Sequence, residues 1–181
     1  MPTRSAHTQT RANSRPARSK APDAIVLLKA DHKTVSGLFK EYEKAEDAAR
    51  KAELAKEICN ELTIHAAIEE EIFYPQARDT LGDDDAGVAL LDEAEVEHGS
   101  LKVLIAEIEE ALHSDRMGGK VDAKVTVLKE YVQHHVKEEE KELFPKLRKS
   151  GMDLPEVGEQ LRERKARIKA DGMNGHLQQL S

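Results

Sequence analysis

Residues 65–75 read HAAIEEEIFYP, and residues 135–145 read HVKEEEKELFP. Both segments place a glutamate four residues after the histidine, an aromatic residue nine after it and a proline ten after it. A spacing of four puts the two polar side chains on the same helix face, one turn apart. The sequence therefore contains an internal duplication, and each copy offers a helical His–Glu pair, His65 with Glu69 and His135 with Glu139.

Apolar residues around the two copies recur at steps of three and four, which is typical of amphipathic helices. This periodicity predicts four helices: one that begins at Asp23 as its N-cap and carries Tyr42, one from Glu53 to Ala77, one between Gly87 and Ser114, and one that begins near Asp122. The Gly- and Asp-rich stretch from Asp79 to Gly87 interrupts the pattern. The predicted inner face of the second helix includes Ile72, and that of the fourth includes Glu142.

Four helices of this length with short connections predict an all-α fold, an antiparallel up-down-up-down four-helix bundle. An all-β fold is excluded because aromatic residues make up only 3% of the chain. We expect three parts: a disordered basic tail over 1–22, the bundle over 23–150, and a helical extension over 151–181. In the extension, residues 156–170 fit one extra helix, and the chain should fray from Gly172.

Charge separates the tail from the rest of the chain. Residues 1–22 carry +5 with no acidic residue, and since the whole chain is at −7, the remainder carries −12. A tail without large apolar residues cannot bury enough surface to become ordered. The acidic body argues against nucleic acid as the main partner.

No apolar run approaches the roughly 20 residues that a membrane-spanning helix needs, and no apolar signal segment follows the basic N-terminus. We therefore expect a cytoplasmic protein with no membrane contact. The single cysteine, Cys59, excludes an intramolecular disulfide and should be a small buried apolar residue. Tyr42 and Tyr131 are predicted to be packing residues.

Polar side chains interrupt the apolar face of each predicted helix. Burying them uncompensated would cost several kcal/mol per group, which exceeds the total stability of about 5–15 kcal/mol of a typical domain. A pair of metal ions would neutralise them, and the alternative is a purely polar core network. The six residues concerned are His32, His65, Glu69, His98, His135 and Glu139.

Four imidazoles and two carboxylates can hold two metal ions. Each ion would take two imidazoles, and both carboxylates and a solvent-derived oxo or hydroxo group would bridge them. This donor set suits iron, manganese, cobalt or zinc better than magnesium or calcium, which prefer oxygen ligands. Ferritin-like di-iron bundles use Glu-x-x-His and more carboxylates, so the His-rich i,i+4 pattern differs from theirs.

At these residues the chain resembles the hemerythrin-like family, whose members carry a His-His-Glu (HHE) cation-binding domain. The resemblance covers about residues 23–147 and implies an antiparallel four-helix bundle with two non-haem iron ions. It implies as ligands His32, His65, Glu69, His98, His135 and Glu139. The ligand to such a centre would be dioxygen or a related small molecule such as peroxide or nitric oxide.

The family's oxygen carriers have a fifth histidine four residues from another on the third helix. Here His98 has Ala94 four residues before it and Lys102 four residues after it. Two functions therefore stay open, a binding or sensing protein and an enzyme acting on hydrogen peroxide or oxygen. His134 should face solvent, and the candidates for a substitute ligand are Glu97, Glu138 and Glu140.

Overall fold

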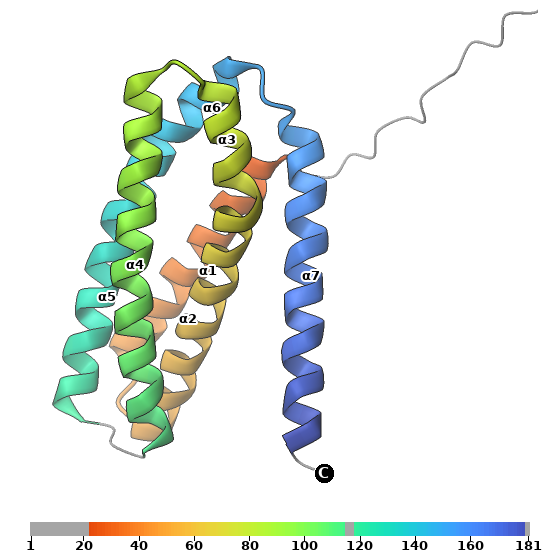
Figure 1. Ribbon diagram of the computed structural model, residues 1–181. Coiled ribbons are helices and arrows are strands. Elements are labelled where there is room, and N and C mark those ends of the chain that lie inside the picture. The colour runs from red at the N-terminus through yellow and green to blue at the C-terminus, as the bar shows by residue number, and fades with distance from the viewer. Residues whose placement is uncertain (1–21, 115–117, 180–181) are drawn as a thin grey trace, which may run out of the picture.

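The computed structural model describes residues 22–114 and 118–179, and within these ranges it contains helices and no strand. The helices build four long rods that lie side by side, with a further helix on one flank (Figure 1). The helices are α1 (Ala24–Lys44), α2 (Ala48–Ile68), η1 (Glu69–Phe73), α3 (Tyr74–Leu81), α4 (Asp85–His113), α5 (Gly119–Glu138), η2 (Glu139–Leu143), α6 (Phe144–Ser150) and α7 (Leu154–Gln179). The predicted all-α fold is confirmed.

Each of the two motif-bearing rods is built from three consecutive helical segments. α2, η1 and α3 follow one another without a break, as do α5, η2 and α6. α1 packs on α2, α2 on α4, and α4 on α5. The Tyr42 hydroxyl of α1 donates a hydrogen bond of 2.8 Å to Asp122 of α5, which joins the first rod to the last. The four rods therefore enclose one common core.

Aspartate side chains cap the helices and fix where they begin. Asp23 accepts a hydrogen bond from the backbone of Val26, as its predicted N-cap role requires. Asp47 caps α2 in the same way, so this helix begins five residues before the predicted Glu53. Asp84 caps α4, which leaves a break of only residues 82–84 in place of the longer interruption expected from the sequence. The fourth rod begins at Gly119, three residues before Asp122.

η1 and η2 are π-helical turns, and the prolines of the duplicated motif explain their positions. The backbone N–H of Tyr74 bonds to the carbonyl of Glu69, five residues back, in place of the usual four. Pro75 follows directly; it lacks an N–H, and its ring would clash with the carbonyl four residues before it in a regular α-helix. The wider turn accommodates the proline without ending the rod.

The extra residue in each π-helical turn shifts the face that points inward. Phe73 and Leu143 are buried, whereas Ile72 is only partly buried and Glu142 is exposed. The inner position predicted for Glu142 is therefore wrong, whereas Ile72 packs against the core without being fully buried. A spacing of 3.6 residues per turn predicts the buried residues before a π-helical turn but not those after it, because the turn contains an extra residue.

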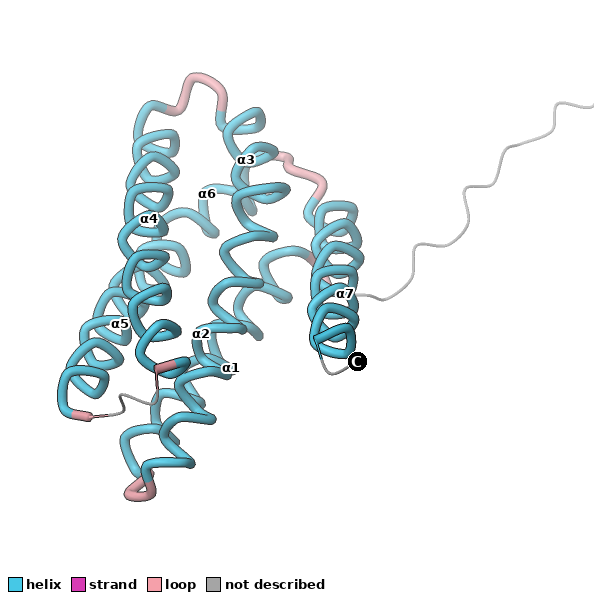
Figure 2. The backbone as a smooth tube through the Cα atoms, turned by 60° about the horizontal axis from the view of Figure 1, so that its bottom comes forward, coloured by secondary structure: helices cyan, strands magenta, loops and turns pink. Residues whose placement is uncertain are grey.

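α7 lies outside the four-rod bundle, against α1 and α2 (Figure 2). It buries Leu154, Val157 and Leu161. Gly158 allows this close approach, since a Cβ there would lie 2.7 Å from the backbone nitrogen of Ala24. The predicted extra helix is confirmed but longer than expected, and it continues to Gln179, so fraying from Gly172 is wrong for residues 172–179. The predicted disordered tail lies outside the described residues, apart from residue 22.

Two apolar clusters fill the core, one on each side of a polar layer. One includes Phe73, Tyr74 and Phe144, and the other includes Val35 and Val132. Cys59 is buried in the second cluster, and burial raises the pKa of its thiol to about 12, so the prediction of a buried apolar role holds. Tyr42 is buried as expected, but Tyr131 is 48% exposed, so its predicted packing role is wrong. Among the described residues, no helix is long and apolar enough to span a bilayer.

Candidate metal centre

The six polar residues singled out in the sequence meet in the polar layer. Each rod contributes one histidine, and the first residue of each π-helical turn contributes a glutamate. All six residues are buried, and none exceeds 6% exposure. They are His32 of α1, His65 of α2, His98 of α4, His135 of α5, Glu69 of η1 and Glu139 of η2.

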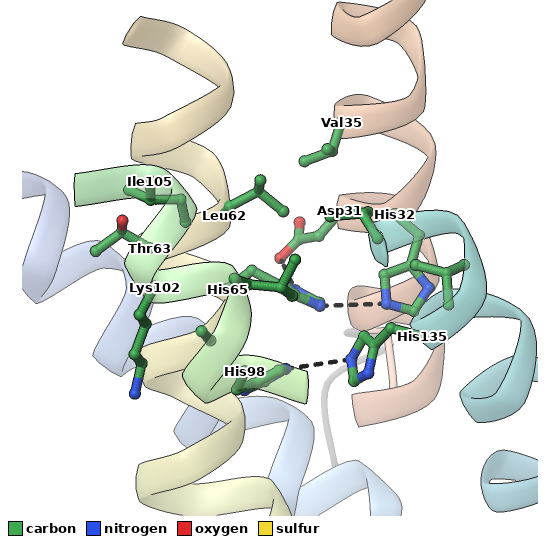
Figure 3. A pocket seen from close by; sticks show the side chains of 14 residues that line it. Asp31, His32, Val35, Leu62, Thr63, His65, His98, Lys102, Ile105 and His135 are labelled. Atoms are coloured by element: carbon green, nitrogen blue, oxygen red, sulfur yellow. Dashed lines mark hydrogen bonds and ion pairs between the residues drawn. The ribbon is translucent and has the colours of Figure 1, made fainter. Parts of the chain in front are cut away.

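The histidines form two pairs (Figure 3). Nε2 of His32 lies 3.2 Å from Nε2 of His65, and Nε2 of His98 lies 3.2 Å from Nε2 of His135. Both pairs thus turn the same ring nitrogen toward the bundle axis. His32 also stacks on Phe144, with ring centroids 5.9 Å apart, which holds its ring plane in place.

The two glutamates reach both histidine pairs. Oε2 of Glu69 lies 3.2 Å from Nε2 of His65 and 3.5 Å from Nε2 of His98. Oε2 of Glu139 lies 3.2 Å from Nε2 of His32 and 3.6 Å from Nε2 of His135. Each carboxylate therefore sits where it could bridge two ions, one beside each histidine pair.

A carboxylate also faces the outer nitrogen of each imidazole. The Nδ1–Oε distance is 3.0 Å from His32 to Glu140, 2.9 Å from His98 to Glu70, and 2.8 Å from His135 to Glu97. For His65 the partner is Asp31, at 3.6 Å. Because an ionised carboxylate only accepts hydrogen bonds, the contacts of His32, His98 and His135 place the imidazole proton on Nδ1. Nε2 is then left with its lone pair directed inward. The longer His65–Asp31 contact is an ion-pair distance without a hydrogen bond.

Facing lone pairs are stabilised by a cation between them, either a metal ion or a shared proton. Without one, each histidine pair would hold two acceptors 3.2 Å apart in a buried site. Two carboxylate oxygens of the centre, Glu69 Oε1 and Glu139 Oε2, are buried without a hydrogen bond. One group of ligand atoms within 4.8 Å of one another comes from His32, His65, Glu69 and Glu139, and another comes from Glu69, His98 and His135. The residues present therefore fit a pair of metal ions.

The pKa shifts of the buried histidines and glutamates are consistent with a site that holds positive charge. Burial, together with the charge of Glu139, raises the pKa of Glu69 well above its usual range. Burial lowers the pKa of His65, and burial with the neighbouring His135 lowers that of His98 to about 4. Burial acts most strongly to lower the pKa of His135, but the charge of Glu139 and the hydrogen bond and charge of Glu97 together leave a net rise. Two adjacent buried carboxylates cannot both stay ionised unless a positive charge joins them.

Tyr74 is a member of the centre that the sequence reading did not single out. Its buried hydroxyl donates to Oε1 of Glu139 at 3.1 Å and lies 3.3 Å from Nε2 of His98 and 3.5 Å from Nε2 of His135. The duplication contained a signal for it, since the matching position in the other copy is Phe144, which has no hydroxyl. The two halves of the centre therefore differ chemically at this position.

A small cavity of about 60 Å³ adjoins the four histidines. Its walls are mainly apolar, and Lys102 lines its outer side (Figure 3). Lys102 pairs with Glu70, the carboxylate that faces His98. Lys102, one of the two positions four residues from His98, is therefore linked to the centre through Glu70.

The structure also locates the residues considered as a substitute ligand. Glu97 and Glu140 face the outer nitrogens of His135 and His32, not the inner layer. Glu138 lies 3.3 Å from Nε2 of His134, whose side chain is 55% exposed, as expected for a solvent-facing residue. None of these three glutamates supplies an inward oxygen comparable to those of Glu69 and Glu139.

Residues 23–147 match the hemerythrin HHE cation-binding domain. The chain belongs to this family. The hemerythrin HHE domain accounts for the bundle and for its buried His/Glu cluster, which is consistent with a metal site. The match does not itself identify the metal or the small ligand.

Two known proteins resemble this HHE chain. A DNA nickase from Nostoc sp. is 30% identical over 122 residues, which is 67% of this chain and 32% of the nickase, so the chain spans about a third of that protein's length. A hemerythrin HHE cation-binding domain-containing protein from Mycobacterium kansasii has a solved structure that matches with a TM-score of 0.67 and 21% identity. That match covers 84% of this chain and 91% of the other, and it shows the shared fold.

Proposed function

We propose that the buried centre holds two iron ions. One would take His32 and His65 as ligands, the other His98 and His135, and Glu69 and Glu139 would bridge them. The observation that carries this proposal is that the Nε2 atoms of all four histidines point inward, while a carboxylate faces the Nδ1 atom of each ring. Imidazole with carboxylate is a donor set that suits iron, and manganese, cobalt and zinc are the alternatives to be tested.

The second part of the proposal is that the centre binds or senses a small ligand such as dioxygen or nitric oxide. Six protein ligands for two ions leave coordination positions free. The adjoining cavity of about 60 Å³ has room for a diatomic molecule, and its apolar walls include Val35, Leu62, Leu101 and Ile105. Iron bound here would supply reversible electron transfer to such a ligand. The walls would exclude bulk water from it.

A second candidate function, the decomposition of hydrogen peroxide, is favoured by Tyr74. A peroxide-consuming enzyme needs a group that can hold or donate a proton near the reacting oxygen atoms. The Tyr74 hydroxyl lies between the second histidine pair and Glu139, and burial with the charges of Glu139 and Glu69 raises its pKa well above the usual range. It would therefore keep its proton at neutral pH and could present it to a bound ligand.

The proposal does not extend to DNA cleavage. The nickase shares only 32% of its length with this chain, and the body of this chain carries −12. We propose a cytoplasmic protein whose partners are small molecules, with no membrane and no nucleic acid among them.

The deciding experiment uses the anaerobically reduced, iron-loaded protein. Dioxygen and then hydrogen peroxide are added while the visible spectrum and the release of oxygen are recorded. A stable and reversible band without turnover supports a binding or sensing protein. Sustained oxygen release from peroxide that is lost in His65→Ala supports the enzyme. Metal analysis that finds only traces of transition metal after iron-replete expression would refute both.

A further inference from the structure

A second group of potential metal ligands lies on the surface formed by α4 and α5. Ligand atoms of Glu93, His134 and Glu138 all lie within 4.8 Å of one another. Nε2 of His134 is 3.3 Å from Glu138 and 3.6 Å from Oε1 of Glu97. We call Glu93, His134 and Glu138 the outer cluster. It combines an imidazole with carboxylates, the same donor types as the buried centre.

Glu97 connects the outer cluster to the buried centre. One oxygen, Oε1, faces Nε2 of His134 at 3.6 Å, and the other, Oε2, faces Nδ1 of His135 at 2.8 Å. His134 and His135 are consecutive residues on α5, and one is 55% exposed while the other is 3% exposed. A single carboxylate therefore contacts both the surface cluster and an inner histidine.

A narrow gap runs behind Glu97 between the two helices. It encloses about 10 Å³, room for about one water-sized group. Its polar lining residues are Glu97, His135, Glu138 and Glu139. Glu139 is 2% exposed, and its Oε2 has no hydrogen bond. A glutamate of the buried centre is therefore among the residues that line the gap.

A much larger opening lies beside the centre on another face. Its charged side chains are mainly basic, whereas those of the outer cluster are mainly acidic. A groove of about 380 Å³ reaches His32 from the surface between α1 and α5. Its charged lining residues are four lysines, Lys40, Lys129, Lys137 and Lys141, and two glutamates, Glu43 and Glu140, so its net charge is positive. Positive charge at its mouth disfavours the approach of a cation. The α4/α5 face is therefore the better route for a metal ion.

We infer that the outer cluster is a capture site for a divalent cation, and that Glu97 and the gap behind it deliver the cation to the buried centre. The inference rests on the proposed buried metal centre. The outer cluster would hold the ion weakly, because its residues are largely exposed and remain hydrated. Its effect would be on the rate at which the centre fills and not on the final amount of metal.

Cobalt(II) uptake by the metal-free full chain tests this inference. Stopped-flow absorbance follows the bands that appear when cobalt enters an imidazole and carboxylate site, without redox chemistry. The test variant combines Glu93→Gln, His134→Ala and Glu138→Gln. The control variant combines Glu109→Gln, Glu110→Gln and His113→Ala, which changes the same residue types at exposed positions near the far end of α4.

We expect the test variant to fill at least about 10-fold more slowly than the wild type at micromolar cobalt, since a local charge cluster raises association rates by roughly 10–1,000-fold. The final stoichiometry should stay the same, and the control variant should fill at the wild-type rate. His134→Ala alone, which leaves all carboxylates in place, should give a smaller slowing.

Equal filling rates in the test and control variants, whether both normal or both slow, would overturn the capture site. Lower final stoichiometry in the test variant would overturn it too, because the outer cluster would then be part of the centre itself. A wild-type chain that takes up no cobalt would instead refute the proposed buried centre, and the capture site with it. Circular dichroism checks that both variants keep their helices.

Discussion

The Tyr74 hydroxyl lies 3.1 Å from Oε1 of Glu139, and so joins one copy of the duplicated motif to the other. The matching position in the second copy is Phe144, which packs on the ring of His32 and donates nothing. The two halves of a centre with near-symmetric ligands are therefore unequal. A difference in reactivity between two ions bound there should depend in part on this hydroxyl.

Replacing Tyr74 by Phe should test that dependence. Phe144 shows that the fold accepts a phenyl ring at the equivalent position, so helicity and metal content should be retained. If the centre decomposes peroxide, we expect oxygen release to fall about 100-fold, within the range typical of a lost acid–base group. Unchanged turnover in a fully metal-loaded Tyr74→Phe protein would rule out a proton-holding role for the hydroxyl.

The ligand assignment predicts opposite outcomes for neighbouring histidines. His135→Ala should lower the iron content from about two per chain to one or less, because it removes an inward Nε2. His134→Ala should leave the content near two, since this side chain faces solvent. Metal analysis of the purified proteins checks both. The reverse pattern would mean that the register of α5 is wrong by one residue.

The carboxylates that face Nδ1 should set the metal affinity. Glu70→Gln replaces the acceptor opposite His98 with an amide, which orients the ring less well and leaves it less basic. Metal affinity should fall by about 10–100-fold, the range typical of such partners. Glu71→Gln is the matched control, since its partner is the exposed Arg164 and it does not contact the centre. Competition with a coloured chelator measures both affinities.

Removing the metal should destabilise the bundle. The buried histidines and glutamates would lose the positive charge that compensates them, and a ligand present at one hundred times its Kd contributes about 2.7 kcal/mol per site. For a chain of this size that corresponds to a fall in Tm of roughly 6–10 °C per site. Calorimetry of the loaded and chelator-treated proteins measures the shift. An unchanged Tm would favour a purely polar core network.

The Tyr42–Asp122 contact predicts a pH dependence away from the centre. Hydrogen bonds from Lys51 and Tyr42 hold the pKa of Asp122 below its ordinary value of 3.8. A pKa lowered in the folded state stabilises the protein above about pH 4, and this contribution disappears as pH falls through the lowered pKa. Asp122 is half exposed, so solvent screening keeps the contribution below about 1 kcal/mol.

Asp122→Asn removes that ionisation. In urea titrations, the free energy of unfolding should be lower in Asp122→Asn than in the wild type by a constant amount between pH 5 and 7. The difference should shrink toward zero below about pH 4. A difference that grows on acidification would contradict the assigned direction of the pKa.

The sequence by itself determined the bundle and its polar layer. The steps of three and four place His32, His65, His98 and His135 on inner helix faces, and burial of so many polar groups is tolerable only if something neutralises them. These features depend on helix periodicity, which is local. The number of rods, their order and the residues of the layer could therefore be read before any tertiary contact was known.

Tertiary structure alone decided how the layer is completed. Glu70, Glu97 and Glu140 lie in runs of acidic residues, and nothing local distinguishes a glutamate that faces an imidazole from one that faces solvent. The π-helical turns also escaped prediction, because they change the inner face by one residue after Glu69 and Glu139. Tyr74 reaches Glu139 only because the two rods pack against each other, and a contact between residues 65 positions apart depends on packing and not on periodicity.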